Sequence, residues 1–357
     1  MKFIDLNDIV PAVAAGTRSR ALATGAEANE YDEITATIPS LREWPEAFIA
    51  AGARHRARGR EAERSGDTAA AVEALFAAAA LFHLATCVPH PGRRGHREAA
   101  EAMKEGLRIS EPTATYISGA SFVGVLRRAP NLASAPLVII VPGLDSSKEE
   151  FRYVADALAL QGLATLSIDG PGQGELAESL PLRADYTPVV SEALDAIDDL
   201  RNADWSPSRI GIAALSLGGF FGTTALAQEP RLKAGLIVSG PHSFDWEQLP
   251  LPVTDTLELR LGSVTAARQF ADAIDLTDME SSITQPVLIV TGGADIIPGV
   301  APAAILTDRI PSATHLFVED GDHLLANASS SWIPQATQWL AFRLNPEADA
   351  TGARNDQ

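Results

Sequence analysis

The sequence predicts an α/β protein in which a mostly parallel sheet is covered by helices on both faces and preceded by a helical domain. From about residue 109 onward, continuous apolar runs alternate with helical stretches, a pattern typical of parallel strands buried on both sides. The first 108 residues lack strand-like alternation and are rich in Ala, Glu and Arg. With 357 residues, 46% of them hydrophobic, the chain can form a large core with an appended domain. The predicted domains are therefore 1–108 and 109–345.

The N-terminal domain is predicted to contain successive antiparallel helices. They are expected at 44–63, 68–87 and 95–106, joined by short breaks at Gly, Asp or Pro. Asp67 or Thr68 is expected to cap the second of these helices, and Pro89 and Pro91 follow its end. The repeat of helices shows no sustained period, so a repeat array is not predicted.

The strands and helices of the second domain follow one another in a regular order. Strands are expected at 113–117, 121–126, 136–141, 210–214, 234–239, 286–291 and 313–318, and helices at 151–161, 188–202, 217–228 and 331–342. The segment 241–283 interrupts this alternation and is expected to help build a substrate pocket. The polar tail, 346–357, is expected to be disordered.

A serine stands at the junction of the apolar run 210–214 and the helix that follows it. Ala214, Ser216 and Gly218 form a small-x-Ser-x-small pattern, which is that of the nucleophile elbow, a strained turn between strand and helix. Ala214 replaces the more usual glycine, but it adds only a methyl group. Taken alone, the pentapeptide is also compatible with an ordinary serine at a strand-to-helix junction.

An acid and a histidine follow this serine in the chain order that a Ser-Asp-His triad requires. Asp295 comes just after the strand 286–291, and His323 comes just after the strand 313–318. In such a triad the histidine removes the proton of the serine hydroxyl, and the acid holds the imidazole in one tautomer. Asp295 could instead be a helix N-cap and His323 a surface residue. Three residues in the right order favour the triad.

Two backbone amides are expected to stabilise the negative charge that develops on the substrate oxygen. The first belongs to Leu217, directly after the serine. The second is assigned to Leu144, in the loop after the strand 136–141, where Gly143 lets the backbone approach a ligand closely. Neighbouring amides of the same loop remain alternatives to Leu144.

Two longer motifs carry a more specific resemblance. The sequences VPGLDSSKEEF at 141–151 and DGPGQGE at 169–175, together with the serine motif, resemble the α/β-hydrolases related to 2,6-dihydroxypseudooxynicotine hydrolase. That family is similar to fermentation-respiration switch esterases and to fungal hydrolases that shorten pigment polyketides. The resemblance extends over roughly residues 45 to 345. It implies the α/β-hydrolase fold with an N-terminal helical cap over the active site.

The resemblance also implies a chemistry. The type member of the family cleaves a carbon-carbon bond beside a ketone, so we expect a serine hydrolase acting on an acyl compound such as a β-dicarbonyl or aryl ketone. It implies neither a metal nor an organic cofactor. Some family members use a further acid after the strand that follows the elbow helix, and here Glu247 is the preferred candidate over Asp245. A solvated loop acid is the alternative for both, and His242 is expected to be a pocket-wall or surface residue.

Charge and cysteine content restrict the partners and the compartment. A formal charge of -18 disfavours binding to nucleic acids and anionic membranes, so the expected partner is a small molecule, and a homodimer stays open as the assembly. The single cysteine, Cys87, excludes an intramolecular disulfide, and no targeting signal is evident, which together predict a cytoplasmic protein. The alanine-rich stretch 68–88 contains Glu73 and His83, which favours a buried helix over a membrane span.

Three functional interpretations follow from these residues. The first is hydrolysis of a carbon-carbon or ester bond through an acyl-serine intermediate. The second is an acyltransferase or cyclase of natural-product biosynthesis, in which a substrate group rather than water captures the same acyl-serine. The third is a non-catalytic binding protein on a hydrolase scaffold, which is disfavoured because all three triad positions are filled.

Overall fold

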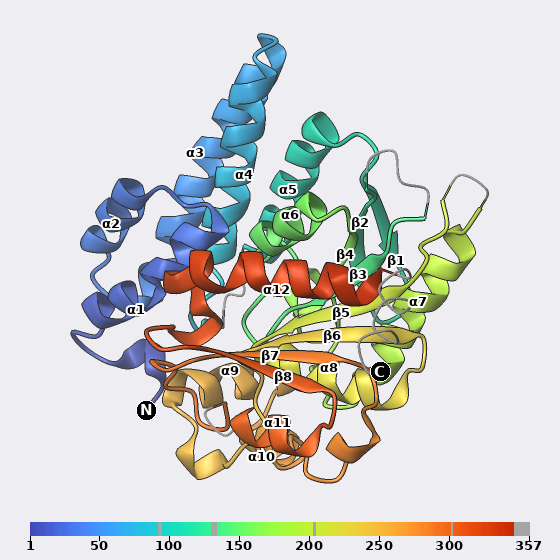
Figure 1. Ribbon diagram of the computed structural model, residues 1–357. Helices are drawn as coiled ribbons and strands as arrows, with labels where there is room; N and C mark the ends of the chain where they lie inside the picture. The colour runs from blue at the N-terminus through green and yellow to red at the C-terminus, as the bar shows by residue number, and fades with distance from the viewer. Residues whose placement is uncertain (92–94, 130–133, 203–204, 301–302, 346–357) are drawn as a thin grey trace.

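The computed structural model describes residues 1–91, 95–129, 134–202, 205–300 and 303–345 (Figure 1). Within these residues, eight strands form one sheet in the order β1-β2-β4-β3-β5-β6-β7-β8. The strands are β1 (Thr115–Ser118), β2 (Val123–Arg127), β3 (Leu137–Val141), β4 (Ala164–Asp169), β5 (Ile210–Leu215), β6 (Leu232–Val238), β7 (Val287–Gly292) and β8 (Ala313–Val318). Strands β3 to β8 run parallel, whereas β1 and β2 pair antiparallel with their neighbours. The predicted, mostly parallel sheet is confirmed.

Both faces of the sheet are buried, which explains why strands such as β3 are apolar throughout. In β3, Ile139 and Val141 belong to one core cluster and Val138 and Ile140 to another, because successive side chains point to opposite faces. The first cluster includes side chains of α7 (Thr187–Leu200) and α8 (Leu217–Gln228). The second includes side chains of α6 (Arg152–Leu160) and α12 (Ser329–Leu344), and Figure 1 shows α12 lying across this face.

One strand was not expected from the sequence. In β4, Thr165 and Ser167 interrupt the apolar run, although both are buried. Parallel pairing with β3 and antiparallel pairing with β2 nevertheless satisfy the backbone of this segment. The second sequence motif begins at the last residue of β4, Asp169, so the motif starts at the carboxyl end of a central strand.

Five α-helices precede the sheet in the described chain. They are α1 (Val10–Thr24), α2 (Ala28–Thr37), α3 (Trp44–Arg64), α4 (Thr68–Leu84) and α5 (His96–Ser110). Figure 1 shows α3 and α4 as a long pair that projects beyond the sheet, and Asp67 caps α4 through a hydrogen bond from Ala70. Helix α5 runs two residues past the predicted domain limit at 108, and β1 starts at Thr115.

The segment between β6 and β7 forms two further helices, α9 (Leu251–Leu261) and α10 (Val264–Asp272), and α11 (Ala303–Arg309) follows β7. Helix α9 begins after Pro250 and ends at Gly262, whose φ of 83° suits a glycine. In the described ranges, no helix combines the length and apolarity needed to cross a membrane. The tail predicted to be disordered, 346–357, lies outside the described residues.

Candidate active site

Ser216 lies on a sharp turn between β5 and α8. Its φ of 56° and ψ of -132° are unfavourable for a residue with a side chain, as expected of a nucleophile elbow. The turn is closely packed: a Cβ at Gly218 would lie 2.5 Å from the carbonyl oxygen of Val141. A Cβ at Gly222 would lie 2.5 Å from the Cβ of Ala214. A glycine thus faces Ala214 from α8, which explains how the elbow accommodates alanine there.

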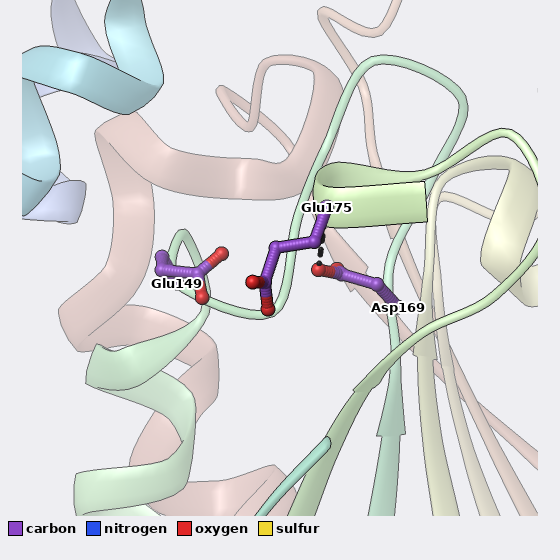
Figure 2. A group of neighbouring side chains, drawn as sticks. All are labelled: Glu149, Asp169 and Glu175. Carbon is purple, nitrogen blue, oxygen red and sulfur yellow. Dashed lines mark hydrogen bonds between the residues drawn. The ribbon is translucent and has the colours of Figure 1, made fainter. Parts of the chain in front are cut away.

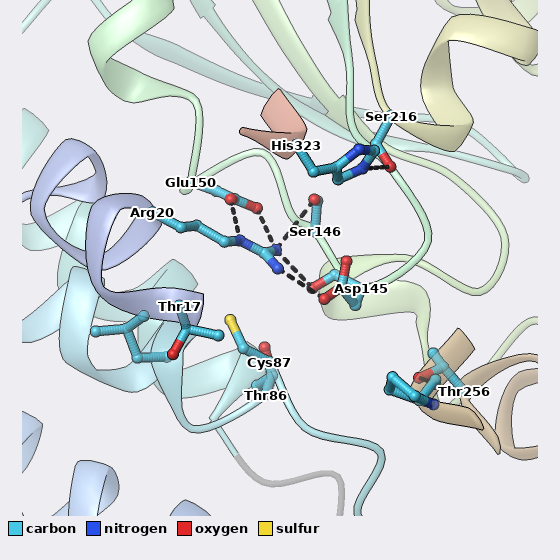
Figure 3. A network of polar contacts seen from close by, with 12 residues as sticks. Thr17, Arg20, Thr86, Cys87, Asp145, Ser146, Glu150, Ser216, Thr256 and His323 are labelled. Carbon is cyan, nitrogen blue, oxygen red and sulfur yellow. Dashed lines mark hydrogen bonds and ion pairs between the residues drawn. The ribbon is translucent and has the colours of Figure 1, made fainter. Parts of the chain in front are cut away.

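The three residues that the sequence predicts as a triad meet at the carboxyl edge of the sheet. Ser216 Oγ lies 2.8 Å from His323 Nε2, and His323 Nδ1 lies 2.8 Å from Asp295 Oδ2 (Figure 3 shows the first of these contacts). The Asp295 side chain is 2% exposed, and its other carboxylate oxygen accepts a hydrogen bond from the amide of Ile297. The buried acid can therefore accept a hydrogen bond from Nδ1–H, which leaves Nε2 free to accept the serine proton.

The backbone after His323 is held in an unusual conformation. Leu324 and Leu325 have φ values of 70° and 53°, in the left-handed region that non-glycine residues seldom adopt. The amide of Leu324 donates to Ser239 Oγ at 3.2 Å, and Trp332 Nε1 donates to the Leu325 carbonyl at 3.1 Å. These contacts hold the histidine in place from β6 and α12.

The loop 142–150, which follows β3, lies against the serine. Gly143 packs directly on Ser216, and Leu144 and Leu217 both line the cavity in front of it. Gln173 Nε2 donates to the carbonyl oxygens of Pro142 at 2.6 Å and Gly143 at 3.1 Å. Because C=O and N–H point in opposite directions across a trans peptide, the bond to Gly143 directs the Leu144 amide away from Gln173.

A cavity of about 180 Å³ opens in front of Ser216 and His323. The segment 241–256 lines it with Pro241, Phe244, Pro252, Val253 and Thr256, and Ile297 and Val300 add further apolar surface. The helical domain contributes Arg20, Cys87 and Pro89. The site is thus an apolar pocket with a few polar groups at its wall, built jointly by the sheet and the N-terminal helices.

The structure does not bring the predicted auxiliary acid to this cavity. Glu247 lies on a short turn (Trp246–Gln248) with its side chain 73% exposed, and its carboxylate pairs with Arg268 at 2.7 Å. Arg268 in turn lies over the ring of Trp246, which keeps the pair at the surface. Asp245 binds the amide of Glu247 and the side chain of Gln248. Neither acid lines the cavity, because the turn directs both toward their own neighbours.

A cluster of charged residues joins the two sequence motifs. Figure 2 shows the carboxylates of Glu149, Asp169 and Glu175 facing one another, and Lys148 Nζ lies 2.6 to 2.9 Å from an oxygen of each. Burial alone would lower the pKa of Lys148, but these carboxylates outweigh it and hold that pKa well above its ordinary value. A lysine thus occupies the charge-compensating position among these acids, and the cluster fastens the loop 142–150 to β4.

On its other side, the loop 142–150 contacts the N-terminal helices. Arg20 of α1 binds Glu150 at 2.5 and 2.8 Å and Asp145 at 2.7 Å (Figure 3). His83 of α4 lies 3.1 Å from Glu150 and 3.2 Å from Ser147 Oγ. Burial would lower the pKa of His83, but the neighbouring Cys87 and Glu150 raise it to about 10. Burial would raise the pKa of Glu150, but Arg20 and His83 hold it far below its ordinary value.

Sequence reasoning missed several residues that shape this site, among them Arg20, Gln173 and Ser239. Gln173 lies inside the motif at 169–175, which marked its position as noteworthy but did not indicate what the side chain does. Arg20 offered none, because the exposed Arg18 stands two residues earlier in the same helix. Ser239 was read only as the end of a strand, yet its φ of 50° and its bond to Leu324 tie β6 to the loop of His323.

The fold and the serine elbow define an α/β-hydrolase, and comparison with known proteins agrees. A family model described as serine aminopeptidase, S33, matches residues 133–275. A 2,6-dihydropseudooxynicotine hydrolase of Paenarthrobacter nicotinovorans is 30% identical over 304 residues, which cover 78% of this chain and 80% of that protein. The chain belongs to the α/β-hydrolase family that includes this enzyme.

A further relative and two solved structures agree with the fold. The α/β-hydrolase ucsC of an Acremonium species is 30% identical over 253 residues, or 62% of this chain and 51% of its own length. The crystal structure of 2,6-dihydroxy-pseudo-oxynicotine hydrolase matches 91% of this chain and 95% of its own, with a TM-score of 0.82 and 23% identity. The structure of AbyA5 matches 97% of this chain and 98% of its own, with a TM-score of 0.72 and 21% identity.

Proposed function

We propose that this enzyme is a serine hydrolase that cleaves a carbon-carbon bond next to a ketone, or an ester bond, through an acyl-serine intermediate. The observation that carries the proposal is the unbroken chain of hydrogen bonds from Ser216 through His323 to the buried Asp295, at the wall of an apolar cavity. Each contact of 2.8 Å is within the range needed for proton transfer. An exposed serine without such partners would be a poor nucleophile.

In the first half of the reaction, Ser216 Oγ attacks the substrate carbonyl carbon while its proton passes to His323 Nε2. The carbonyl oxygen gains the negative charge, and the amides of Leu144 and Leu217 stabilise it. When the tetrahedral intermediate collapses, the bond to the leaving group breaks. His323 returns the proton to that group, which is an alkoxide for an ester and an enolate carbon for a 1,3-diketone. The acyl group remains on Ser216.

In the second half, water replaces the leaving group. His323 takes one proton from the water as its oxygen attacks the acyl-serine carbonyl, and the same two amides stabilise the new oxyanion. Collapse of this intermediate breaks the bond to Ser216 Oγ, which recovers its proton from His323. The balanced result is one carboxylic acid and one alcohol or ketone for each water consumed.

The cavity supports a small, uncharged acyl group as substrate. Its lining is mostly apolar, and its acid, Asp145, is already paired with Arg20. A volume of about 180 Å³ suits a compact acyl or aryl group better than a long chain. The relationship to a 2,6-dihydropseudooxynicotine hydrolase supports a ketone as the reacting group. With Glu247 outside the cavity, His323 is the group assigned to protonate the leaving carbon.

The test is to incubate the wild type and Ser216→Ala with a fluorophosphonate, p-nitrophenyl esters and aryl 1,3-diketones. We expect a phosphonyl adduct on Ser216 and turnover of at least one substrate class in the wild type, and neither in the variant. Intact-protein mass spectrometry measures the adducts and chromatography the products. Turnover by Ser216→Ala at the wild-type rate would refute the proposal. If water does not hydrolyse the acyl-enzyme, but an added alcohol or amine accepts its acyl group, the enzyme is an acyltransferase instead.

A further inference from the structure

Two adjacent residues of the N-terminal helix α1 contact two different loops of the active site. Ser19 Oγ donates to Asp322 Oδ2 at 2.5 Å, and Asp322 directly precedes His323. Arg20 binds the loop 142–150 at Asp145, Ser146 and Glu150. Helix α1, more than a hundred residues from both loops in the sequence, thus contacts the residue before the catalytic histidine and the loop that carries the Leu144 amide.

We propose that Arg20 is a positioning residue that holds the loop 142–150 in the conformation in which the Leu144 amide can stabilise the oxyanion. The inference rests on the proposed serine hydrolase function and extends it to the helical domain. On this view, docking of α1 completes the catalytic arrangement, rather than only closing the substrate pocket.

The contacts of Arg20 span the loop from Asp145 to Glu150. Nε and Nη2 form a two-pronged pair with the Glu150 carboxylate, at 2.5 and 2.8 Å. Nη1 reaches the Asp145 carboxylate at 2.7 Å, and Nη2 also lies 3.3 Å from the Asp145 carbonyl oxygen and from Ser146 Oγ. Such a rigid, planar fork can hold two carboxylates at a fixed separation, which a lysine ammonium group cannot do.

The surroundings make this arrangement firm. The Glu150 side chain is 1% exposed and that of Arg20 14%, so water can replace few of these hydrogen bonds. His83 supports the same loop from α4 through Glu150 and Ser147. On the opposite side, Gln173 holds the carbonyls of Pro142 and Gly143. Gln173 thus holds the peptide that carries the Leu144 amide through the Gly143 carbonyl, and Arg20 holds the residue that follows, Asp145.

Arg20 is expected to affect the stabilisation of the oxyanion and not the proton transfer. Leu144 directly precedes Asp145, so a change at Asp145 is expected to shift the Leu144 peptide, whereas Arg20 takes no part in the contacts between His323, Ser216 and Asp295. Loss of Arg20 is therefore expected to weaken oxyanion stabilisation without changing the proton transfer. A displacement of about 1 Å at a catalytic group can lower the rate about 10²-fold.

The test compares Arg20→Lys with a control on the same helix, Arg18→Lys, in the full-length protein. Arg18 pairs with Asp32 at the surface, 42% exposed, and contacts no loop of the site in the described structure. The measured quantity is the rate constant of Ser216 labelling by a fluorophosphonate, as a function of pH. We expect the rate to fall about 10²-fold in Arg20→Lys, with an unchanged pH midpoint, and to stay at the wild-type value in Arg18→Lys.

A second variant separates positioning from folding. Replacing Arg20 alone by an apolar residue leaves the buried Glu150 with His83 but without its arginine partner, so Arg20→Met is combined with Glu150→Gln, and the melting temperature is measured alongside. A slow but folded double variant supports the inference. Wild-type labelling in either Arg20 variant overturns it, as does a shifted pH midpoint, which would assign the effect to His323. Failure of the wild type to label at all would instead refute the proposed serine hydrolase.

Discussion

Gly143 and Ser216 are in closer contact than any other residue type at position 143 would allow. A Cβ at Gly143 would lie 2.8 Å from Ser216 Cβ and 3.1 Å from Ser216 Oγ, the atom assigned as nucleophile. Real Cβ atoms do not approach carbon this closely, so either the loop 142–150 or the serine would have to move. The glycine therefore sets the distance between the nucleophile and the amide of Leu144.

Gly143→Ala is expected to lower the rate of Ser216 labelling and of turnover about 10²-fold, because the added methyl group displaces the serine or the loop. Urea unfolding should show that the protein still folds. Gly16→Ala is the matched control: a Cβ there would meet nothing within 4 Å, and the site is an exposed helix interior. That control should keep full activity and gain about 0.5–1 kcal/mol in stability. Equal activity in both variants would contradict the assigned role of the loop.

Asp295→Asn is expected to lower kcat about 10⁴-fold, because an amide at this position can donate to Nδ1 and favours the wrong tautomer of His323.

Glu247→Gln removes an exposed carboxylate that pairs with Arg268 and should leave turnover of both esters and diketones unchanged. Steady-state kinetics on one substrate of each class measures both effects. A selective loss of diketone cleavage in Glu247→Gln would restore the auxiliary role first expected for this acid.

Lys148→Met is expected to destabilise the protein by about 3–5 kcal/mol, because it leaves Asp169 and Glu149 buried without their counter-charge. Arg64→Met, which removes an ion pair with Glu61 whose side chains are 71% and 65% exposed, should cost less than about 1 kcal/mol. Urea denaturation midpoints measure the difference. Similar losses in the two variants would show that the cluster joining the two motifs is not tightly coupled to the fold.

The buried pair of His83 and Glu150 predicts a stability that declines in alkali. The pKa of His83 is about 10 in the folded protein, above its ordinary value of 6.5, so the folded state holds an extra proton between these values. The stabilisation is fully present below about pH 6.5 and is lost as the pH rises toward 10. Urea midpoints between pH 6 and 10 should therefore fall more steeply in the wild type than in His83→Gln.

A second variant checks the cause of that pH dependence. Glu150→Gln removes the carboxylate that favours protonated His83, so it should reduce the slope of stability against pH in the same window. The double variant with His83→Gln should add little further change, because the two residues act as one pair. Independent, additive effects would show that the raised pKa of His83 has another origin.

The residues that local sequence could identify are those with a fixed relation to a strand. Ser216, Asp295 and His323 each follow an apolar run, and such runs predict strands because buried parallel strands need apolar side chains on both faces. The carboxyl ends of parallel strands meet at one edge, so chain order alone brought the three residues together. The missed strand, β4, failed the same rule, because Thr165 and Ser167 are polar yet buried.

Residues whose role depends on docking between distant segments could not be identified in this way. Arg18 and Arg20 lie about 200° apart around α1, and nothing in their neighbourhood distinguishes the surface arginine from the one that enters the site. Glu247 illustrates the opposite case: it follows the expected strand, but its turn pairs it with Arg268 at the surface. Both outcomes depend on tertiary packing, which local sequence does not encode.

The contacts of α1 with two active-site loops also bear on how molecules enter and leave. If the helical domain swung away as a hinged lid, the bonds from Ser19 to Asp322 and from Arg20 to Asp145 would have to break in every catalytic cycle. Substrate and product are therefore expected to enter and leave while α1 stays docked. Substrate size would then be limited by the cavity itself, and enlarging that cavity should admit larger molecules without slowing the chemistry.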